Sequence, residues 1–273
     1  MGYELPRSGR LIDRIKINRV EHRQLNGRAY WVKRRLGWSR LLIPCANTFF
    51  ALAGNPVRVL ADLEEWQQRE LASFHTLHGA EGYTAFYDPE QHAVWAMEMP
   101  GISVEEPARK GLLNRPTLTA IATELKRAHR LPSPAQGGLW SHGDPHMGNF
   151  LLDESTGRVR LIDFEVLHAA HLSETERQAD DLLVVLQCMM EYGDLAAWLQ
   201  WCHDFLDGYQ QVHPDEATSR TILCLRSRLK IPHTLIERLW WAVRTAYLPE
   251  AERNRRIVAL KESLGSYPLV TAI

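Results

Sequence analysis

SHGDPHMGNFLLDESTGRVRLIDFE, the stretch from Ser141 to Glu165, contains two short apolar runs that are separated by a turn. The runs are Phe150–Leu152 and Val159–Ile162, and Thr156-Gly157 lies in the segment between them. Two such runs joined by a short segment that contains glycine are typical of a β-hairpin. The residues with reactive side chains therefore stand on the loop before the hairpin and at the end of its second strand.

Three of those residues, Asp144, Asn149 and Asp163, have the short oxygen-bearing side chains that phosphoryl transfer requires. The reaction needs a group that orients the attacking hydroxyl and hard oxygen ligands that bind Mg²⁺. Protein kinases supply them with an aspartate, an asparagine five positions later, and a hairpin that leads to aspartate and phenylalanine. The same order occurs here in His142-Gly143-Asp144 with Asn149, followed by Asp163-Phe164-Glu165.

With these motifs the sequence resembles the aminoglycoside phosphotransferase and lipopolysaccharide core kinase branch of the protein-kinase-like superfamily. In that branch the loop reads HGDxxxxN and the metal motif often reads DxE. The resemblance implies an α+β, two-lobed fold that uses ATP and Mg²⁺. It places a small β-rich N-lobe, an antiparallel sheet plus one helix, at residues 1–100 and a mostly helical C-lobe at residues 101–273.

The resemblance also implies a role for each motif residue. Asp144 is the base or orienting group for the acceptor hydroxyl, and Asn149 and Asp163 are Mg²⁺ ligands. His142 braces the loop and takes no part in the chemistry. For Glu165 two roles stay open, because the side chain either supports the metal site or faces solvent.

A lysine and a glutamate in the front part are expected to form an ion pair. Apolar residues between Leu60 and His78 recur at helical spacing, and Glu70 falls on the same side of that helix. A carboxylate on an inward face needs a cation, because an unpaired buried charge is costly. Lys33 ends an apolar strand and is the expected partner that also holds the phosphates, with Arg34 and Arg35 as rivals.

The segment His92–Met99 reads as a strand, and Pro100-Gly101 closes it as the expected hinge between the lobes. The resemblance implies that the backbone at Glu98 and Met99 binds the adenine base. A helix is expected over Pro116–Leu131.

Near the N-terminus, the runs Leu11–Ile17 and Ala29–Val32 flank Asn26-Gly27, which predicts a β-hairpin. The pattern from Asp180 onward is helical, and the last eighty residues match no known pattern.

Two features depart from regulated protein kinases. The segment before Lys33 has a single glycine, Gly27, and no G-x-G-x-x-G, so no glycine-rich phosphate loop is predicted. After Glu165 there is no A-P-E motif, and the chain is expected to run straight into a helix. The second feature argues against a regulated protein kinase that acts on polypeptides.

Composition excludes several other classes of protein. The 273 residues are 45% hydrophobic with a net charge of −1, and four scattered cysteines, expected to be reduced and mostly buried, suggest neither a disulfide framework nor a zinc ribbon. The N-terminus has no apolar export signal, and Leu41–Gly54 is shorter than the ~20 residues of a spanning helix. We therefore expect a cytoplasmic protein.

The acceptor is predicted to be a sugar or a glycolipid such as lipopolysaccharide core. Residues 1–40 and 220–261 are strongly basic, and the apolar segment Trp38–Phe50 lies beside Arg34, Arg35 and Arg40. Such a segment suits peripheral contact with an anionic membrane surface at the inner face of the cell membrane. The same apolar residues are equally consistent with a core position.

Other functions are kept as alternatives. A small-molecule kinase of the aminoglycoside or choline type, or a Ser/Thr protein kinase, would use the same motifs. A metal-dependent hydrolase would use His142, Asp144 and His146 as ligands. No motif for nucleic acid binding is present in the required context, so no nucleic acid partner is expected.

Overall fold

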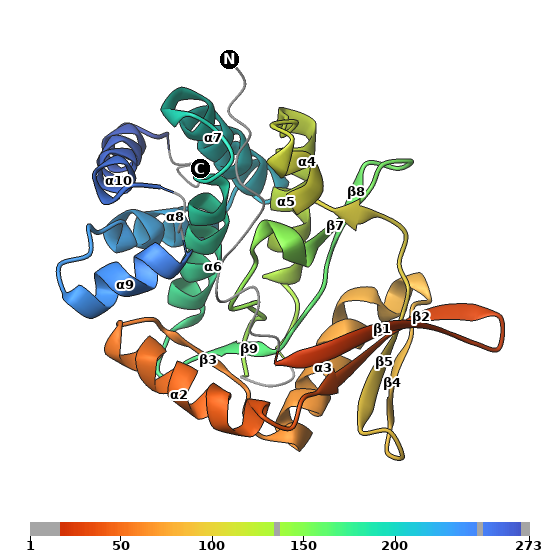
Figure 1. The fold of residues 1–273 in the computed structure, drawn as a ribbon. Helices are drawn as coiled ribbons and strands as arrows, with labels where there is room; N and C mark the ends of the chain where they lie inside the picture. Colours follow the sequence, from red (N-terminus) through yellow and green to blue (C-terminus); the bar gives the residue numbers. More distant parts are fainter. Residues whose placement is uncertain (1–16, 134–136, 245–247, 269–273) are drawn as a thin grey trace.

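The computed structural model describes residues 17–133, 137–244 and 248–268. It has a β-rich front part and a helical back part, joined through the hinge and packed against each other (Figure 1). This arrangement confirms the predicted α+β fold with a small β-rich front part and a mostly helical back part. The division at residue 100 remains a prediction.

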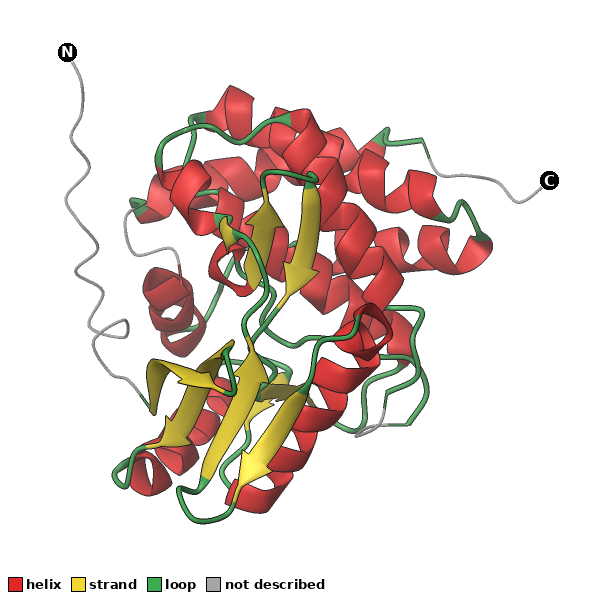
Figure 2. Cartoon of the chain, turned by 90° about the vertical axis from the view of Figure 1, so that its right-hand side faces the viewer, coloured by secondary structure: helices red, strands yellow, loops and turns green. Residues whose placement is uncertain are grey.

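The front sheet has four antiparallel strands in the order β1-β2-β5-β4. Figure 2 shows them side by side, below the helical part. The strands are β1 (Asn18–Leu25), β2 (Arg28–Arg35), β4 (Ala85–Asp88) and β5 (Ala93–Met97).

The N-terminal hairpin is confirmed, but its first strand is β1 and not Leu11–Ile17, most of which lies outside the described residues. Asn26 and Gly27 form the two-residue turn with φ values of 52° and 76°. Both values lie in the left-handed region that favours Asn and Gly, so Gly27 serves the turn.

Helix α3 (Leu63–His78) runs along the sheet and confirms the helix expected between Leu60 and His78. Asp62 caps it, because its carboxylate accepts the Glu65 N–H at 2.8 Å. Glu70 is buried, as the helical spacing predicts.

The front part also contains a helix that the sequence analysis did not expect. Helix α2 (Ser39–Leu52) makes two helices where one was predicted. It packs on strand β3 (Val57–Val59) and on helix α9 (Leu235–Arg244). Only part of its apolar surface faces the core: Ile43 is 2% exposed, whereas Leu41 is 77% exposed.

At the hinge, Pro100 and Gly101 lead from β5 to strand β6 (Ile102–Ser103). Gly101 has φ +134°, and a Cβ there would lie 2.8 Å from the Leu152 carbonyl oxygen. A side chain would therefore force the two segments apart, which explains why glycine stands at this crossing.

The predicted hairpin after the catalytic loop is strands β7 (Phe150–Asp153) and β8 (Arg158–Leu161), with β6 on the outer side of β7. After Glu165 the chain does not enter a helix directly. Strand β9 (Val166–His168) comes first and pairs with β3, so the expected direct entry into a helix is wrong.

Helices form most of the back part. Helix α5 confirms the predicted helix, and its inward side chains Leu118, Ile121, Leu125 and Ala128 are fully buried. Of the four cysteines, all free, only Cys202 is buried, so the expectation of mostly buried thiols is wrong. The helices are α4 (Glu105–Arg109), α5 (Arg115–Ala128), α6 (Glu174–Met189), α7 (Leu195–Val212), α8 (Glu216–Arg228), α9 and α10 (Glu250–Gly265), and the short 3-10 turns are η1 (Gly79–Glu81) and η2 (Met147–Asn149).

Among the residues that the structure describes, no helix combines the length and hydrophobicity needed to cross a bilayer.

Candidate active site

Lys33, Glu70, Asp163 and Glu165 meet in one cluster between the two parts of the molecule, which we call the Lys33 cluster. The Lys33 Nζ donates to Glu70 Oε1 at 2.6 Å and also to Asp163 Oδ1, and it lies 3.5 Å from Glu165 Oε2. The expected Lys33 and Glu70 pair is thus present. A second contact, to Asp163 from the back part, joins the two lobes at this point.

The two rival arginines take other places. Arg34 reaches the exposed Gln91 side chain, away from the cluster. Arg35 donates to the Leu60 carbonyl at 2.9 Å and lies 3.5 Å from Glu165 Oε2, so it borders the cluster without replacing Lys33. Lys33 and Arg35 are two residues apart on one strand and share a face, which is why both approach the same carboxylates.

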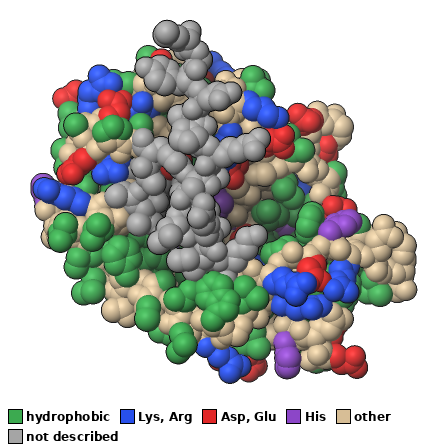
Figure 3. Space-filling model, in the orientation of Figure 1, with side chains coloured by type: hydrophobic (Ala, Val, Ile, Leu, Met, Phe, Trp, Pro, Cys, Tyr) green, Lys and Arg blue, Asp and Glu red, His purple; other side chains and the backbone are tan. Residues whose placement is uncertain are grey.

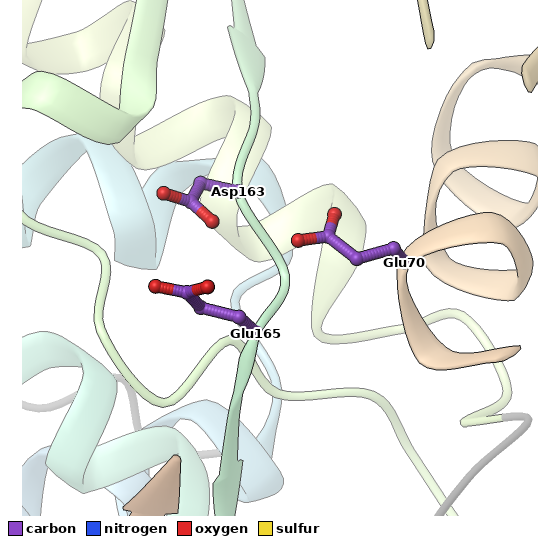
Figure 4. Close-up of side chains that lie close together, drawn as sticks. All are labelled: Glu70, Asp163 and Glu165. Carbon is purple, nitrogen blue, oxygen red and sulfur yellow. The ribbon is translucent and has the colours of Figure 1, made fainter. Parts of the chain in front are cut away.

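Figure 4 shows the carboxylates of Glu70, Asp163 and Glu165 close together. All three lie next to the Lys33 ammonium group, and Glu165 also lies next to the Arg35 guanidinium group. Burial alone would lower the pKa of Lys33, but the carboxylates of Asp163, Glu165 and Glu70 raise it well above its usual value. Burial opposes charge on Asp163 as well, yet Lys33 holds the pKa of that carboxyl below its usual value. The pKa of Glu165 is raised by burial and by the neighbouring Asp163 charge.

Backbone geometry also marks Asp163. Its φ is +66°, a left-handed value that is rare for residues other than glycine. This conformation turns the Asp163 carboxylate toward Lys33 while the next side chain, Phe164, packs into the core with 1% exposure. The Phe164 N–H donates to Glu70 Oε2 at 3.3 Å, so Glu70 contacts both Lys33 and the backbone next to Asp163.

The loop that carries Asp144 closes on itself. The Asn149 Nδ2 donates to the Asp144 carbonyl at 2.9 Å, which leaves its Oδ1 as the amide's acceptor atom. The Ile162 N–H donates to the Asn149 carbonyl at 2.9 Å, so the loop is tied to the residue before Asp163. The Asp144 side chain is 41% exposed, so its carboxylate is accessible from solvent.

His142 lies inside the loop with both ring nitrogens engaged. Its Nε2 donates to the Ile162 carbonyl at 3.0 Å, and its Nδ1 accepts the Asp144 N–H at 3.3 Å. Burial lowers the pKa of this imidazole, which keeps it neutral. The geometry fits the bracing position predicted for His142 and removes it as a metal ligand, so the hydrolase site of His142, Asp144 and His146 is not formed.

Two buried charged residues that the sequence analysis missed hold this loop, one from α3 and one from α6. The Arg69 guanidinium donates to the Phe164 carbonyl at 3.2 Å and to the Ser141 carbonyl at 2.9 Å. Asp181 accepts the backbone N–H groups of His142 at 2.7 Å and Gly143 at 2.8 Å. We refer to Arg69 and Asp181 as the loop anchors.

The signal for Arg69 was present in the sequence. Trp66, Arg69, Ser73 and Leu77 follow helical spacing, and Arg69 is 1% exposed on that stripe. Asp181 stands beside Asp180 in a helical pattern, and nothing local distinguishes the two. Burial in the back part, with His129 Nε2 at 3.0 Å, identifies Asp181 only in the folded protein.

A cavity of about 390 Å³ opens beside the Lys33 cluster. Its wall includes Lys33, Asp163, Glu98, Met99 and, from the hinge, Gly101. The predicted cofactor-binding residues thus line one space. The cavity is large enough for a nucleotide base and sugar and is closed on one side by apolar side chains.

At the hinge, one backbone donor is already engaged. The Glu98 N–H donates to the Ala29 carbonyl at 2.9 Å, and the Glu98 carboxylate lies 3.2 Å from His22 Nε2. A base in this cavity would therefore meet the Glu98 carbonyl and the Met99 backbone and not the Glu98 amide.

The oxygen donors fit a hard divalent cation. Ligand atoms of Glu70, Asp163 and Glu165 lie within 4.8 Å of one another. Lys33 contacts both Glu70 and Asp163, so neither carboxylate is free of it. Asp163 and Asn149, the ligands predicted from the sequence, are the oxygen-bearing residues that could hold the cation, with Glu165 beside Asp163. The sequence left open whether Glu165 supports the metal site or faces solvent. Its side chain is only 16% exposed, so it does not face solvent.

Comparison with known proteins indicates the class of protein to which this chain is similar. Residues 47–174 match the model of the phosphotransferase enzyme family. The match covers a little under half of the chain and includes Glu70, the catalytic loop and Asp163, whereas Lys33 lies outside it. Together with the fold, it supports a kinase-type phosphotransferase, a class that uses ATP with a divalent metal.

Among solved structures, a similar chain is "Structure of vaccinia related kinase 3". The identity is 13%, with 93% of this chain and 86% of that chain covered and a TM-score of 0.39. This level of similarity supports no conclusion about the acceptor. A search of curated proteins finds no match.

Proposed function

We propose that this chain is an ATP- and Mg²⁺-dependent kinase that transfers the γ-phosphoryl group to a hydroxyl of a sugar or glycolipid. One observation carries the proposal: Lys33 bridges Glu70 of the front part and Asp163 of the back part at the edge of a nucleotide-sized cavity. A buried lysine with two carboxylate partners is suited to hold phosphate oxygens between the lobes.

Each residue of the site has a task that its contacts support. Lys33 binds phosphate oxygens while Glu70 keeps it in place, and Asp163 and Asn149 provide oxygen ligands for Mg²⁺. Bound Mg²⁺ supplies neutralisation of the charge on the transferred group. Asp144 accepts the proton of the acceptor hydroxyl as that oxygen bonds to phosphorus and the bond to ADP breaks.

Exposed apolar side chains support an acceptor at a membrane surface. Leu41 and Leu52 of α2 are 77% and 63% exposed, and Leu235 and Leu239 of α9 are 72% and 50% exposed. Hydrophobic side chains gather on this face of the molecule (Figure 3). With Arg40 beside them, they suit contact with anionic lipid at the cytoplasmic face of a membrane, where a glycolipid would be met.

The test is an ADP-release assay with Mg²⁺ and ATP against four acceptors: lipopolysaccharide core, lipid-free core oligosaccharide, aminoglycosides or choline, and a generic protein substrate. We expect turnover with the first two and loss of turnover in Asp144→Asn. Turnover only with amino alcohols would establish the small-molecule alternative, and turnover only with protein would establish a Ser/Thr kinase.

A further inference from the structure

A second cavity, of about 270 Å³, lies away from the nucleotide cavity and has no part in the function described so far. It is open to solvent and is lined by the chain that follows α2, by helix α6, by the segment between α8 and α9, and by α9 itself. Asp180, Leu183 and Gln187 line it from α6 at spacings that place them on one helix face. We refer to it as the α6–α9 pocket.

From this pocket we infer a binding site for a saccharide ring of the acceptor, apart from the hydroxyl that receives the phosphoryl group. The inference rests on the proposed function only in taking the saccharide to be part of the acceptor substrate. Binding of a saccharide by the pocket residues does not depend on catalysis. Four features of the pocket carry it.

The first feature is an amide without a partner. Gln187 is 4% exposed, and within the described part of the chain its side chain makes no hydrogen bond. A buried amide left unpaired costs free energy unless a ligand or water satisfies it. The Asn55 Nδ2, also on the pocket wall, is buried without an acceptor among the described residues, while its Oδ1 accepts the Val57 N–H. Amides that can donate and accept suit ligand hydroxyls.

The second feature is the aromatic wall. Trp240 and Trp241 line the pocket from α9. Phe49 and Phe50 of α2 pack edge-on against Trp240, with ring centroids at 6.2 and 4.8 Å, and hold it in position. An indole face beside amide groups matches a pyranose ring, which has an apolar C–H face and a polar rim.

The third feature is the balance of charge. Arg228 lies 3.5 Å from Asp180, and Glu237 accepts the N–H groups of His233 and Thr234, so these acids are already partnered. Lys230 is exposed and makes no ion pair within the described residues. The pocket has no excess of free carboxylates that would favour a polyamine, and the single unpaired cation tolerates an acidic sugar.

The fourth feature is proximity to the catalytic loop. Asp180 lies 3.4 Å from His168 Nε2, and His168 Nδ1 lies 3.0 Å from the Ser141 Oγ at the start of that loop. The next residue, Asp181, holds the backbone of the loop itself. A glycan that occupied the pocket would thus lie on the same helix that positions Asp144.

The experiment measures binding and catalysis separately, with lipid-free core oligosaccharide that contains heptose and Kdo as the probe. Calorimetric titration without ATP gives the Kd, and steady-state assays give KM and kcat for the oligosaccharide. The variants are Gln187→Met, which keeps the shape and removes the amide, and the exposed Lys230→Met, which leaves the core untouched. Gln68→Met, on the outer face of α3, is the matched control.

We expect Gln187→Met to raise Kd and KM about tenfold, since one buried amide interaction is lost, with kcat and the KM for ATP unchanged. Lys230→Met raises Kd and KM in the same direction by less, and Gln68→Met changes neither. Phosphorylation of the oligosaccharide with unchanged Kd and KM in both pocket variants overturns the pocket and leaves the kinase proposal standing. Absence of both binding and turnover in the unaltered protein overturns both.

Discussion

The Lys33 cluster and the loop anchors are built from the same residue types, yet their surroundings differ. Each anchor meets groups of the opposite polarity: Arg69 faces backbone carbonyls and Asp181 faces backbone N–H groups. The Lys33 cluster instead holds three carboxylates against two cations, and it borders a cavity. The anchors therefore serve stability, whereas in the proposed function the unbalanced negative charge of the cluster serves to hold a cation.

The strongest test of this contrast is Asp163→Asn. Asparagine tolerates the left-handed backbone at this position, so the fold should persist. We expect phosphoryl transfer to fall at least about a hundredfold because a charged ligand is lost. The free energy of unfolding should change less than in a variant of a loop anchor, because Lys33 keeps its partner Glu70 and the Asp163 side chain is partly exposed. Activity assays and urea unfolding measure the two effects. A large loss of stability in Asp163→Asn would show that the Lys33 cluster stabilises the fold as the loop anchors do.

The opposite result is expected at an anchor. Asp181→Asn removes the charge that binds two backbone N–H groups and His129, so we expect a loss of about 3 kcal/mol in the free energy of unfolding. Asp194→Asn, at the N-cap of α7, is the control and should be nearly neutral because Asn caps as well as Asp. Equal stability of the two variants in urea titrations would show that Asp181 is no anchor.

A smaller effect is expected on the pH dependence of stability. His78 donates its Nε2 proton to the Leu161 carbonyl behind the cluster, and burial lowers its pKa from 6.5 to about 4. Between these values the unfolded chain binds more protons than the folded one, so stability falls as the pH falls. We expect His78 to lower the free energy of unfolding by about 2 kcal/mol when the pH falls from 7 to 5.

His78→Phe tests this contribution, because a ring beside Phe74 and Phe164 preserves packing and cannot titrate. Urea titrations of both proteins at the two pH values give the slope. A variant as sensitive to pH as the unaltered protein would assign the effect to other groups, such as His129 or His142, whose pKa burial also lowers.

The smallest effect is expected for Glu165→Gln. The pKa of Glu165 is raised, so its charged form is disfavoured in the fold, and a neutral side chain should slightly increase the Tm at neutral pH. Gln can still accept the Asn18 Nδ2 hydrogen bond. A clear decrease in Tm by scanning calorimetry would mean that the pairing with Arg35 outweighs the repulsion from Asp163.

Local patterns predicted much of the fold. The hairpin β7–β8, helix α3 and helix α5 follow from short-range periodicity and turn residues, which act within about ten to twenty positions along the chain. Helix α2 was not predicted as part of the front lobe, because its apolar run suited a core or a membrane equally well. Its packing on β3 and α9 involves residues far away in the sequence.

The sequence alone determined the reactive groups, since Asp144, Asn149 and Asp163 stand within one short loop and hairpin whose geometry is local. Tertiary structure decided the rest. Lys33 and Arg35 point to the same side of β2, so only the packing of α3 selects which one Glu70 holds. Asp181 and Gln187 acquire their surroundings only when α6 meets the catalytic loop and α9, because burial and pairing depend on contacts that no local pattern contains.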